Sequence, residues 1–262
     1  MIPWLPPEPL EPRGRLTPFP ATNTALGDDT EAPGLLCAGA NLGTRRLEAA
    51  YRQGIFPWFG EGEPILWWTT APRMVLQVDQ FKLHRSLKKT LRKFVATPGC
   101  EVAIDADCPA VIAACSGVDR KGQGGTWIVP AMVEAYIRWH HAAGPSSGVH
   151  SFETRVDGQL VGGLYGVSIG RMFYGESMFA LSSDASKIAL AALVAWCRGQ
   201  GISWIDCQQQ TRHLASMGAA PVSRTVFESH LGRVTVMPRP CGPNDWSYDP
   251  TQWSRLGLDS AD

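Results

Sequence analysis

Residues 175–179 read Gly-Glu-Ser-Met-Phe, and residues 205–208 read Ile-Asp-Cys-Gln. Both segments resemble buried strands, yet each carries acidic or amide side chains. A charge or amide that is buried without a partner costs free energy, so these polar groups require a bonding partner or a function. Side chains alternate along a strand, which predicts that Asp206 and Gln208 share one face with Trp204. We therefore expect Glu176, Asp206 and Gln208 to meet at one site.

The segments around this pair predict an α+β unit. Residues 151–156, 159–168 and 171–179 are strand-like, and the turns Asp157-Gly158 and Ile169-Gly170 predict an antiparallel meander. A helix over 185–198 and a strand over 202–207 follow. This order matches the N-acetyltransferase (GNAT-type) scaffold, which has a mostly antiparallel sheet. In that scaffold a glycine-rich loop before the helix binds pyrophosphate, but residues 180–184 read Ala-Leu-Ser-Ser-Asp, which argues against coenzyme A as a donor.

The first part of the chain has a different character. Residues 1–33 are rich in proline and predict irregular chain. A helix over 44–52, an aromatic loop over 54–59 and strands over 64–68 and 74–78 follow. We therefore predict a small N-terminal domain over residues 1–79 and an acetyltransferase-like domain with a C-terminal tail over residues 80–262.

Bulk properties exclude several classes of protein. The 262 residues have zero formal net charge, so contact with nucleic acid would require a local basic patch. The seven cysteines contain no CxxC pair, which argues against a zinc ribbon or a disulfide framework. We expect no metal site, because the adjacent His140 and His141 cannot both face one ion from a helix. Without a secretory signal or an apolar run of membrane-spanning length, we predict a cytoplasmic protein with no membrane partner.

One such basic patch is predicted at residues 81–94. Leu83, Leu87, Leu91 and Phe94 share one helical face, and cations occupy the rest of the surface. A run of charge is usually a solvated helix face. The alternative is a helix that binds phosphates, for which the candidates are Arg85, Lys88, Lys89, Arg92 and Lys93.

A series of short motifs resembles the leucyl/phenylalanyl-tRNA–protein transferase family, in that family's order and from about residue 33 to 231. Each motif alone is weak, but the set is very specific. The motifs lie at residues 50–59, 64–68, 72–73, 125–128, 150–151, 160–167, 175–179, 185–187, 205–208, 213–214, 216 and 218–219.

The resemblance implies an aminoacyltransferase with no cofactor. It would move leucine, phenylalanine or methionine from aminoacyl-tRNA to proteins that begin with Arg or Lys, which the N-end rule then directs to degradation. The donor ester is already activated, so the reaction requires neither ATP nor a metal. Two alternatives remain open: an acyl-CoA-dependent N-acyltransferase of a small molecule or peptide, and a non-catalytic RNA-binding module.

The resemblance also implies roles for individual residues. Gln208 would hydrogen-bond the attacking amine or the ester oxygens, Asp206 would polarise Gln208 or take up charge, and Glu176 would hold an amine. The competing interpretation is that both carboxylates make structural hydrogen bonds. The aminoacyl pocket would be lined by Leu164, Met178, Leu190, Leu193, Cys197 and Ile205. The terminal adenosine would be bound by Trp58, Trp127, Tyr51 and Tyr136.

Overall fold

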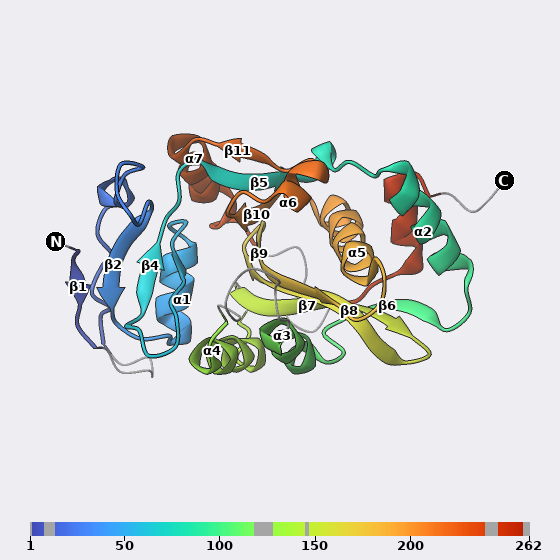
Figure 1. Cartoon of the computed structure of the whole chain (residues 1–262), viewed down its shortest axis with the longest axis horizontal. Helices are drawn as coiled ribbons and strands as arrows, with labels where there is room; N and C mark the ends of the chain where they lie inside the picture. Colours follow the sequence, from blue (N-terminus) through green and yellow to red (C-terminus); the bar gives the residue numbers. More distant parts are fainter. Residues whose placement is uncertain (1, 8–13, 118–127, 145–146, 239–245, 259–262) are drawn as a thin grey trace.

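The computed structural model describes residues 2–7, 14–117, 128–144, 147–238 and 246–258, which form two sheets (Figure 1). The smaller sheet is N-terminal and has the strand order β1-β2-β4-β3. Helix α1 (Thr44–Tyr51) lies between this sheet and the rest of the molecule (Figure 1). The strands of the smaller sheet are β1 (Trp4–Leu5), β2 (Leu35–Gly39), β3 (Phe56–Pro57) and β4 (Leu66–Trp68).

The larger sheet has seven strands in the order β11-β5-β10-β9-β8-β7-β6. All neighbours pair antiparallel except β9 and β10, which are parallel. The predicted meander is confirmed, and so is the α+β class with a mostly antiparallel sheet. The strands are β5 (Arg73–Gln77), β6 (Cys100–Ile104), β7 (Ser147–Val156), β8 (Gln159–Ile169), β9 (Met172–Ala180), β10 (Trp204–Gln208) and β11 (Ala220–Val222).

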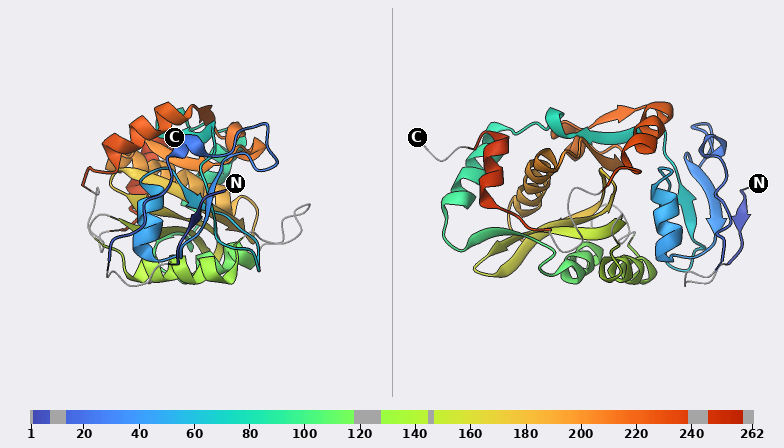
Figure 2. Two further views of the ribbon diagram at one scale, coloured as in Figure 1. Left: turned by 90° about the vertical axis from the view of Figure 1, so that its left-hand side faces the viewer. Right: turned by 180° about the vertical axis from the view of Figure 1, so that it is seen from behind.

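Helices cover both faces of the larger sheet (Figure 2). Helix α5 (Ala185–Gln200) connects β9 to β10 and packs on one face together with α2 (Arg85–Ala96). Helices α3 (Cys108–Gly117) and α4 (Pro130–His141) pack on the other face. The shorter helices are α6 (Arg212–Ser216), α7 (Arg224–Val234), η1 (Thr22–Thr24), η2 (Val78–Gln80) and η3 (Pro250–Leu256).

The glycines of β8 bring α5 close to the sheet. A Cβ atom on Gly162 would lie 2.4 Å from the Cβ of Ala185, the first residue of α5. Glycines inside a strand predict a bulge or the close approach of a ligand. The bulge is confirmed, because the β7–β8 pairing shifts by one residue at Val161, next to Gly162. The close neighbour of Gly162 is α5, so this glycine also allows the helix to pack on the sheet.

The N-termini of the helices are capped in different ways. Thr44 is the first residue of α1, and Gly43 occupies the cap position. Asp184 caps α5 only through its backbone, and its carboxylate instead lies 2.7 Å from the Lys187 ammonium. At α7 a side chain makes the cap, because the Ser223 hydroxyl accepts a hydrogen bond from the Val226 amide.

The two sheets meet along the chain between β4 and β5. Strand β5 pairs with β10 in the larger sheet, so the change of sheet falls at residues 69–72, ahead of the expected boundary at residue 79. We propose the domain boundary at this crossover. Among the described residues, no helix is both long enough and apolar enough to cross a lipid bilayer.

Candidate functional site

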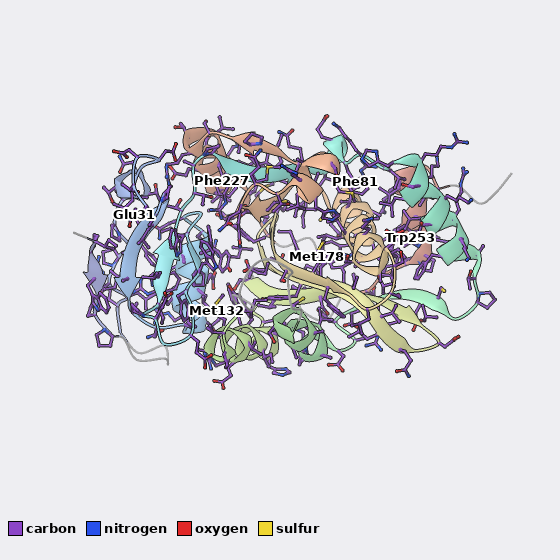
Figure 3. All side chains as sticks on the ribbon, viewed as in Figure 1. Glu31, Phe81, Met132, Met178, Phe227 and Trp253 are labelled. Carbon is purple, nitrogen blue, oxygen red and sulfur yellow. The ribbon has the colours of Figure 1, made fainter. Side chains whose placement is uncertain are left out.

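A cavity of about 430 Å³ opens where the two sheets meet. Its walls come from β8, β9, β10, α5 and α6, with Phe56 and Trp58 added by the N-terminal part. Met178 lies near the centre of the molecule, and Phe227 lies on α7 toward the N-terminal sheet (Figure 3). The predicted residues that line the cavity are Trp58, Leu164, Glu176, Met178, Leu190, Leu193, Ile205, Asp206 and Gln208.

Two adjacent β-bulges set the polar end of this cavity. On β9, Glu176 is the extra residue between Gly175 and Ser177, which pair with consecutive residues of β8. On β10, Cys207 is the extra residue, and Gln208 takes a left-handed φ of 57°. A bulge bends its strand and re-aims a side chain. The β9–β10 pairing also ends at Asp206, so the two strands separate where Glu176 and Gln208 face each other.

Glu176 is the centre of a buried hydrogen-bond network. The Tyr51 hydroxyl donates to Oε1 at 2.7 Å, the Tyr136 hydroxyl donates to Oε2 at 3.2 Å, and Gln208 Nε2 donates to Oε1 at 2.8 Å. The pKa of Glu176 is raised to about 7, mainly by burial and also by the nearby Asp206 charge. The two tyrosine hydrogen bonds and the Arg73 charge oppose this shift. A carboxyl group with this pKa can exchange a proton at neutral pH.

Asp206 borders the cavity, but its carboxylate is fully buried in an ion pair with Arg73. Arg73 Nε lies 2.8 Å from Oδ1, and Arg73 Nη2 lies 2.6 Å from Oδ2, which makes the pair bidentate. Oδ1 also accepts a hydrogen bond from the Gln208 amide at 2.9 Å. Both oxygens of Asp206 are therefore engaged. Asp206 contacts the Gln208 backbone rather than its side chain, which corrects the expected role in polarising that side chain.

Arg73 joins three parts of the fold. Its guanidinium lies between the rings of Phe56 and Phe227, with its central carbon 4.7 and 4.9 Å from their centroids. It also donates to the Gly54 carbonyl oxygen at 3.1 Å. The sequence places Arg73 in a family motif but assigns it no role, because its partner lies 133 residues further along the chain.

The apolar wall of the cavity agrees with the sequence except at one position. Leu164, Met178, Leu190, Leu193 and Ile205 all line it. Cys197 is fully buried on α5 and does not reach the cavity, because it lies one helical turn beyond Leu193. The prediction of Cys197 as a pocket residue is therefore wrong.

The structure supports one residue of the predicted adenosine site and excludes two others. Trp58 borders the cavity and is 36% exposed, so a base can reach its ring. Tyr51 and Tyr136 are fully buried and bind Glu176. Because neither ring has an exposed face, the prediction that these two tyrosines bind the terminal adenosine is wrong. Trp127 lies outside the described residues.

The basic helix α2 forms a separate surface. Arg85, Lys88, Lys89 and Arg92 line a shallow hollow together with Ser86, and Lys93 is exposed on the same helix. Leu87, Leu91 and Phe94 face the core, as the sequence predicts. Across the described part of the chain, no carboxylate forms an ion pair with these cations.

The sequence misses several lining residues near α6. These side chains follow β10 or begin the next helix, and no charge pattern marks them. The pKa of His213 is lowered by partial burial and by the nearby Lys187 ammonium. The missed lining residues near α6 are Gln209, Thr211, His213 and Leu214. Elsewhere the missed residues are Phe56 on β3 and the strand residues Tyr165, Gly175, Ser177 and Cys207.

Family comparison agrees with the motifs that surround this cavity. The family model described as leucyl/phenylalanyl-tRNA protein transferase matches residues 75–232, and the model of that family's N-terminal domain matches residues 40–71. The chain belongs to the leucyl/phenylalanyl-tRNA–protein transferase family. A member from Leptothrix cholodnii is 62% identical over 98% of this chain and 96% of its own length. A member from Methylibium petroleiphilum is 56% identical over 93% of this chain and 89% of its own length.

A solved structure shares only a distant likeness with this family member. A GCN5-related N-acetyltransferase from Kribbella flavida has a TM-score of 0.30 and 12% identity, covering 65% of this chain and 57% of its own. This likeness carries no weight on the function of the transferase. The two family models together include every residue that lines the cavity.

Proposed function

We propose that this chain transfers leucine, phenylalanine or methionine from aminoacyl-tRNA to the α-amine of proteins that begin with Arg or Lys. The observation that carries this proposal is the Glu176–Gln208 pair, which stands at the polar end of an apolar cavity. An apolar wall suits a leucyl or phenylalanyl side chain, and the polar end suits an amine and an ester. The names of the relatives support the donor and the reaction class.

The reaction requires one bond to form and one to break. The neutral α-amine attacks the ester carbonyl carbon, the new C–N bond forms, and the ester C–O bond to the terminal ribose breaks. In our proposal the Gln208 amide orients the amine and the carbonyl oxygen, and Glu176 accepts the proton that the amine loses. That proton then leaves on the ribose hydroxyl, so the atoms and charges balance.

Asp206 and Arg73 are proposed as positioning residues. Their ion pair is closed off from the cavity, and the Asp206 carboxylate fixes the Gln208 amide at the bulge. Gln208 is thus held in a left-handed conformation that points its side chain at Glu176. A buried pair that holds a functional side chain this way acts through geometry.

The donor tRNA is proposed to bind at two places. The terminal adenosine would stack on Trp58, with Trp127 as the second aromatic residue that the family resemblance implies. A stacked base contributes about 1–3 kcal/mol. The acceptor-stem phosphates would contact α2 without reading the base sequence. We further propose that the protein works in the cytoplasm and marks its acceptors for degradation by the N-end rule.

The acyl-CoA alternative has a specific argument against it. A pyrophosphate would bind at the N-terminus of α5, where donors of the helix point outward. The Asp184 carboxylate lies at this end of the helix and pairs with Lys187. A negative charge at this position disfavours a phosphate ligand.

A direct assay tests the proposed function. Purified protein is expected to move labelled leucine from leucyl-tRNA to a peptide that begins with Arg, without added ATP. A peptide with an acetylated N-terminus is the matched control, because it has no free α-amine. Absence of transfer to the free peptide would contradict the proposal, as would equal labelling of both peptides.

The basic helix yields a separate prediction. Replacing both Lys88 and Lys89 by Glu is expected to weaken tRNA binding and to lower the steepness of its salt dependence, because each phosphate contact contributes about 0.7–0.9 to that slope. The measurement is tRNA affinity against salt concentration. Arg233→Glu, on α7 at the other end of the sheet, is the control and should leave the slope unchanged. The same slope in the Lys88/Lys89 variant would indicate that α2 is only a solvated surface.

A further inference from the structure

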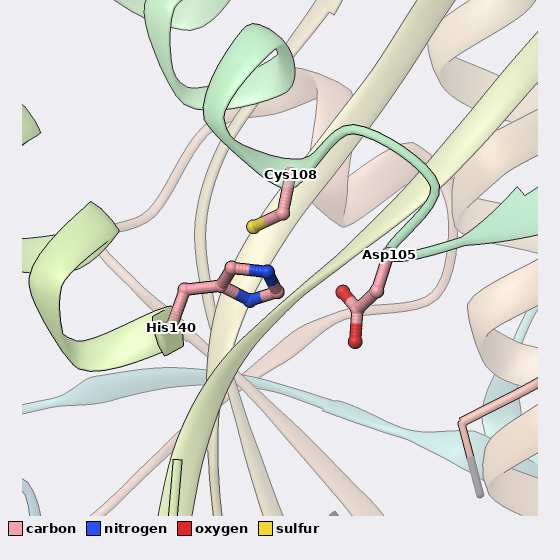
Figure 4. Close-up of side chains that lie close together, drawn as sticks. All are labelled: Asp105, Cys108 and His140. Atoms are coloured by element: carbon pink, nitrogen blue, oxygen red, sulfur yellow. The ribbon is translucent and has the colours of Figure 1, made fainter. Parts of the chain in front are cut away.

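A second cluster of polar side chains lies away from the transfer cavity. Asp105 follows β6, Cys108 begins α3, and His140 lies in the last turn of α4. One ligand atom from each of the three lies within 4.8 Å of the other two. The three side chains converge on one space between the elements that carry them (Figure 4). None of these three residues lines the cavity that contains Glu176 and Gln208. The sequence analysis predicts no metal site.

We propose that Asp105, Cys108 and His140 bind a divalent transition metal of the zinc type. Thiolate, imidazole and carboxylate are the three donor types that zinc takes from proteins, and three protein ligands leave a fourth position for water. The mixture of a soft sulfur with nitrogen and oxygen disfavours magnesium and calcium, which prefer oxygen ligands alone.

The hydrogen bonds around the cluster orient its donors. His140 Nδ1 lies 2.9 Å from the Val149 carbonyl oxygen, so this nitrogen carries the proton and donates it. His140 Nε2 is then the unprotonated nitrogen, and the ring edge that bears it faces Cys108 and Asp105 (Figure 4). Metal-binding histidines in proteins usually donate their second ring N–H to a carbonyl or carboxylate in this manner.

The carboxylate is also held in place. Asp105 Oδ1 accepts a hydrogen bond from the Ser151 amide at 2.7 Å, and Oδ2 lies 2.5 Å from His150 Nδ1. Asp105 adopts a left-handed φ of 56°, which is uncommon for a residue with a side chain and requires support from its surroundings. Carboxylates that bind metals are commonly hydrogen-bonded to a second layer of residues, and each oxygen retains a further lone pair.

The thiol and the access route are consistent with a metal. Cys108 is fully buried, and its sulfur lies within 4.8 Å of a ligand atom of Asp105 and of His140. A divalent cation placed among these groups would neutralise the negative charge of a thiolate and a carboxylate. Asp105 and His140 are partly exposed, so an ion can enter from solvent. The site would tie β6, α3 and α4 together, and α4 carries Tyr136.

Cobalt(II) is the probe for this site, because a thiolate–cobalt bond gives a charge-transfer absorption band. The full chain, stripped of metal with a chelator, is expected to gain this band with one cobalt per chain and to lose it when zinc is added. Cys108→Ser should abolish the band. Cys115→Ser is the matched control, since Cys115 is a second buried thiol on the same helix, and it should retain the band.

Two further variants keep the test decisive if Cys108→Ser does not fold. Asp105→Asn and His140→Gln should each weaken cobalt binding by about tenfold or more while retaining the charge-transfer band at high cobalt. Zinc should raise the thermal midpoint of the unmodified chain and of Cys115→Ser. An unchanged band in Cys108→Ser, or cobalt affinity unchanged in the other two variants, would overturn the proposal.

Discussion

Asp206→Ala is expected to lower the free energy of unfolding by about 3–5 kcal/mol, because it leaves the Arg73 guanidinium buried without a partner charge. Arg73 and Asp206 are both almost completely buried, so water cannot replace the lost carboxylate. The measurement is the urea concentration at the midpoint of unfolding, which should fall while the dependence of the unfolding free energy on urea stays unchanged. Glu228→Ala is the control, since its ion pair with Arg224 spans 4.0 Å and is partly exposed. Its other contact is a hydrogen bond from the Thr22 hydroxyl, so a loss of about 1 kcal/mol is expected there.

A double replacement separates stability from function at the same pair. Arg73→Met combined with Asp206→Leu removes both charges together, so much of the lost stability should return. Transfer should not return, because the Gln208 amide has lost its acceptor and a misplaced side chain can cost about 10²-fold. Recovery of transfer along with stability would show that the pair is only a structural element. An unchanged urea midpoint in Asp206→Ala would contradict the burial argument itself.

Glu176→Gln is expected to lower the transfer rate by about 10²-fold at alkaline pH, because the variant has no carboxylate to accept the amine's proton. In the unmodified protein, transfer should fall as the pH drops below about 7, where Glu176 becomes protonated. This step in the pH profile of the transfer rate should be absent in Glu176→Gln. A second step at a pH of about 8, from the acceptor amine itself, should remain in both proteins. The measurement is the single-turnover rate against pH.

A second variant checks that the step belongs to Glu176. The Tyr136 hydroxyl stabilises the ionised carboxylate through its hydrogen bond, which lowers the pKa. Tyr136→Phe should therefore move the step to higher pH without abolishing transfer. If the step stays in place in Tyr136→Phe and persists in Glu176→Gln, another group titrates.

The same pKa shift affects stability, with a defined sign. The pKa of Glu176 in the folded state, about 7, lies above its ordinary value of 4.5. Between these values the folded state binds more protons than the unfolded state, so stability falls as the pH rises through this window. The difference in unfolding free energy between the unmodified protein and Glu176→Gln should show this decline and level off above pH 7.

The sequence predicts the elements of this fold well, because strand alternation and turn residues are local signals. The meander, the helix after it and the strand with Asp206 and Gln208 all lie near their predicted positions. The glycines of β8 predict a bulge, but they do not predict that Glu176 and Cys207 are the extra residues, since this depends on the register of two strands. Alternation alone pairs Asp206 with Gln208, whereas the bulge gives the two side chains different partners.

Burial explains the other differences at the site. Tyr51 and Tyr136 both donate hydrogen bonds to Glu176. The sequences of their helices do not reveal that these faces pack against a buried carboxylate. Cys197 has the apolar character of a pocket residue, but only the packing of α5 decides which of its buried positions reach the cavity. Long-range partners such as Arg73 for Asp206 require the assembled sheet.

The Gln208 side chain provides the most direct test of the proposed mechanism. Gln208→Asn keeps an amide, and asparagine tolerates the left-handed backbone at this position. Its side chain is one methylene shorter, so its amide cannot reach Glu176 to form the 2.8 Å hydrogen bond that Gln208 makes. The measurement is single-turnover transfer of labelled leucine, with leucyl-tRNA affinity determined on the same protein. We predict a loss of transfer of about 10²-fold with tRNA affinity changed by less than about twofold. Equal losses in transfer and affinity, or full transfer, would contradict the account.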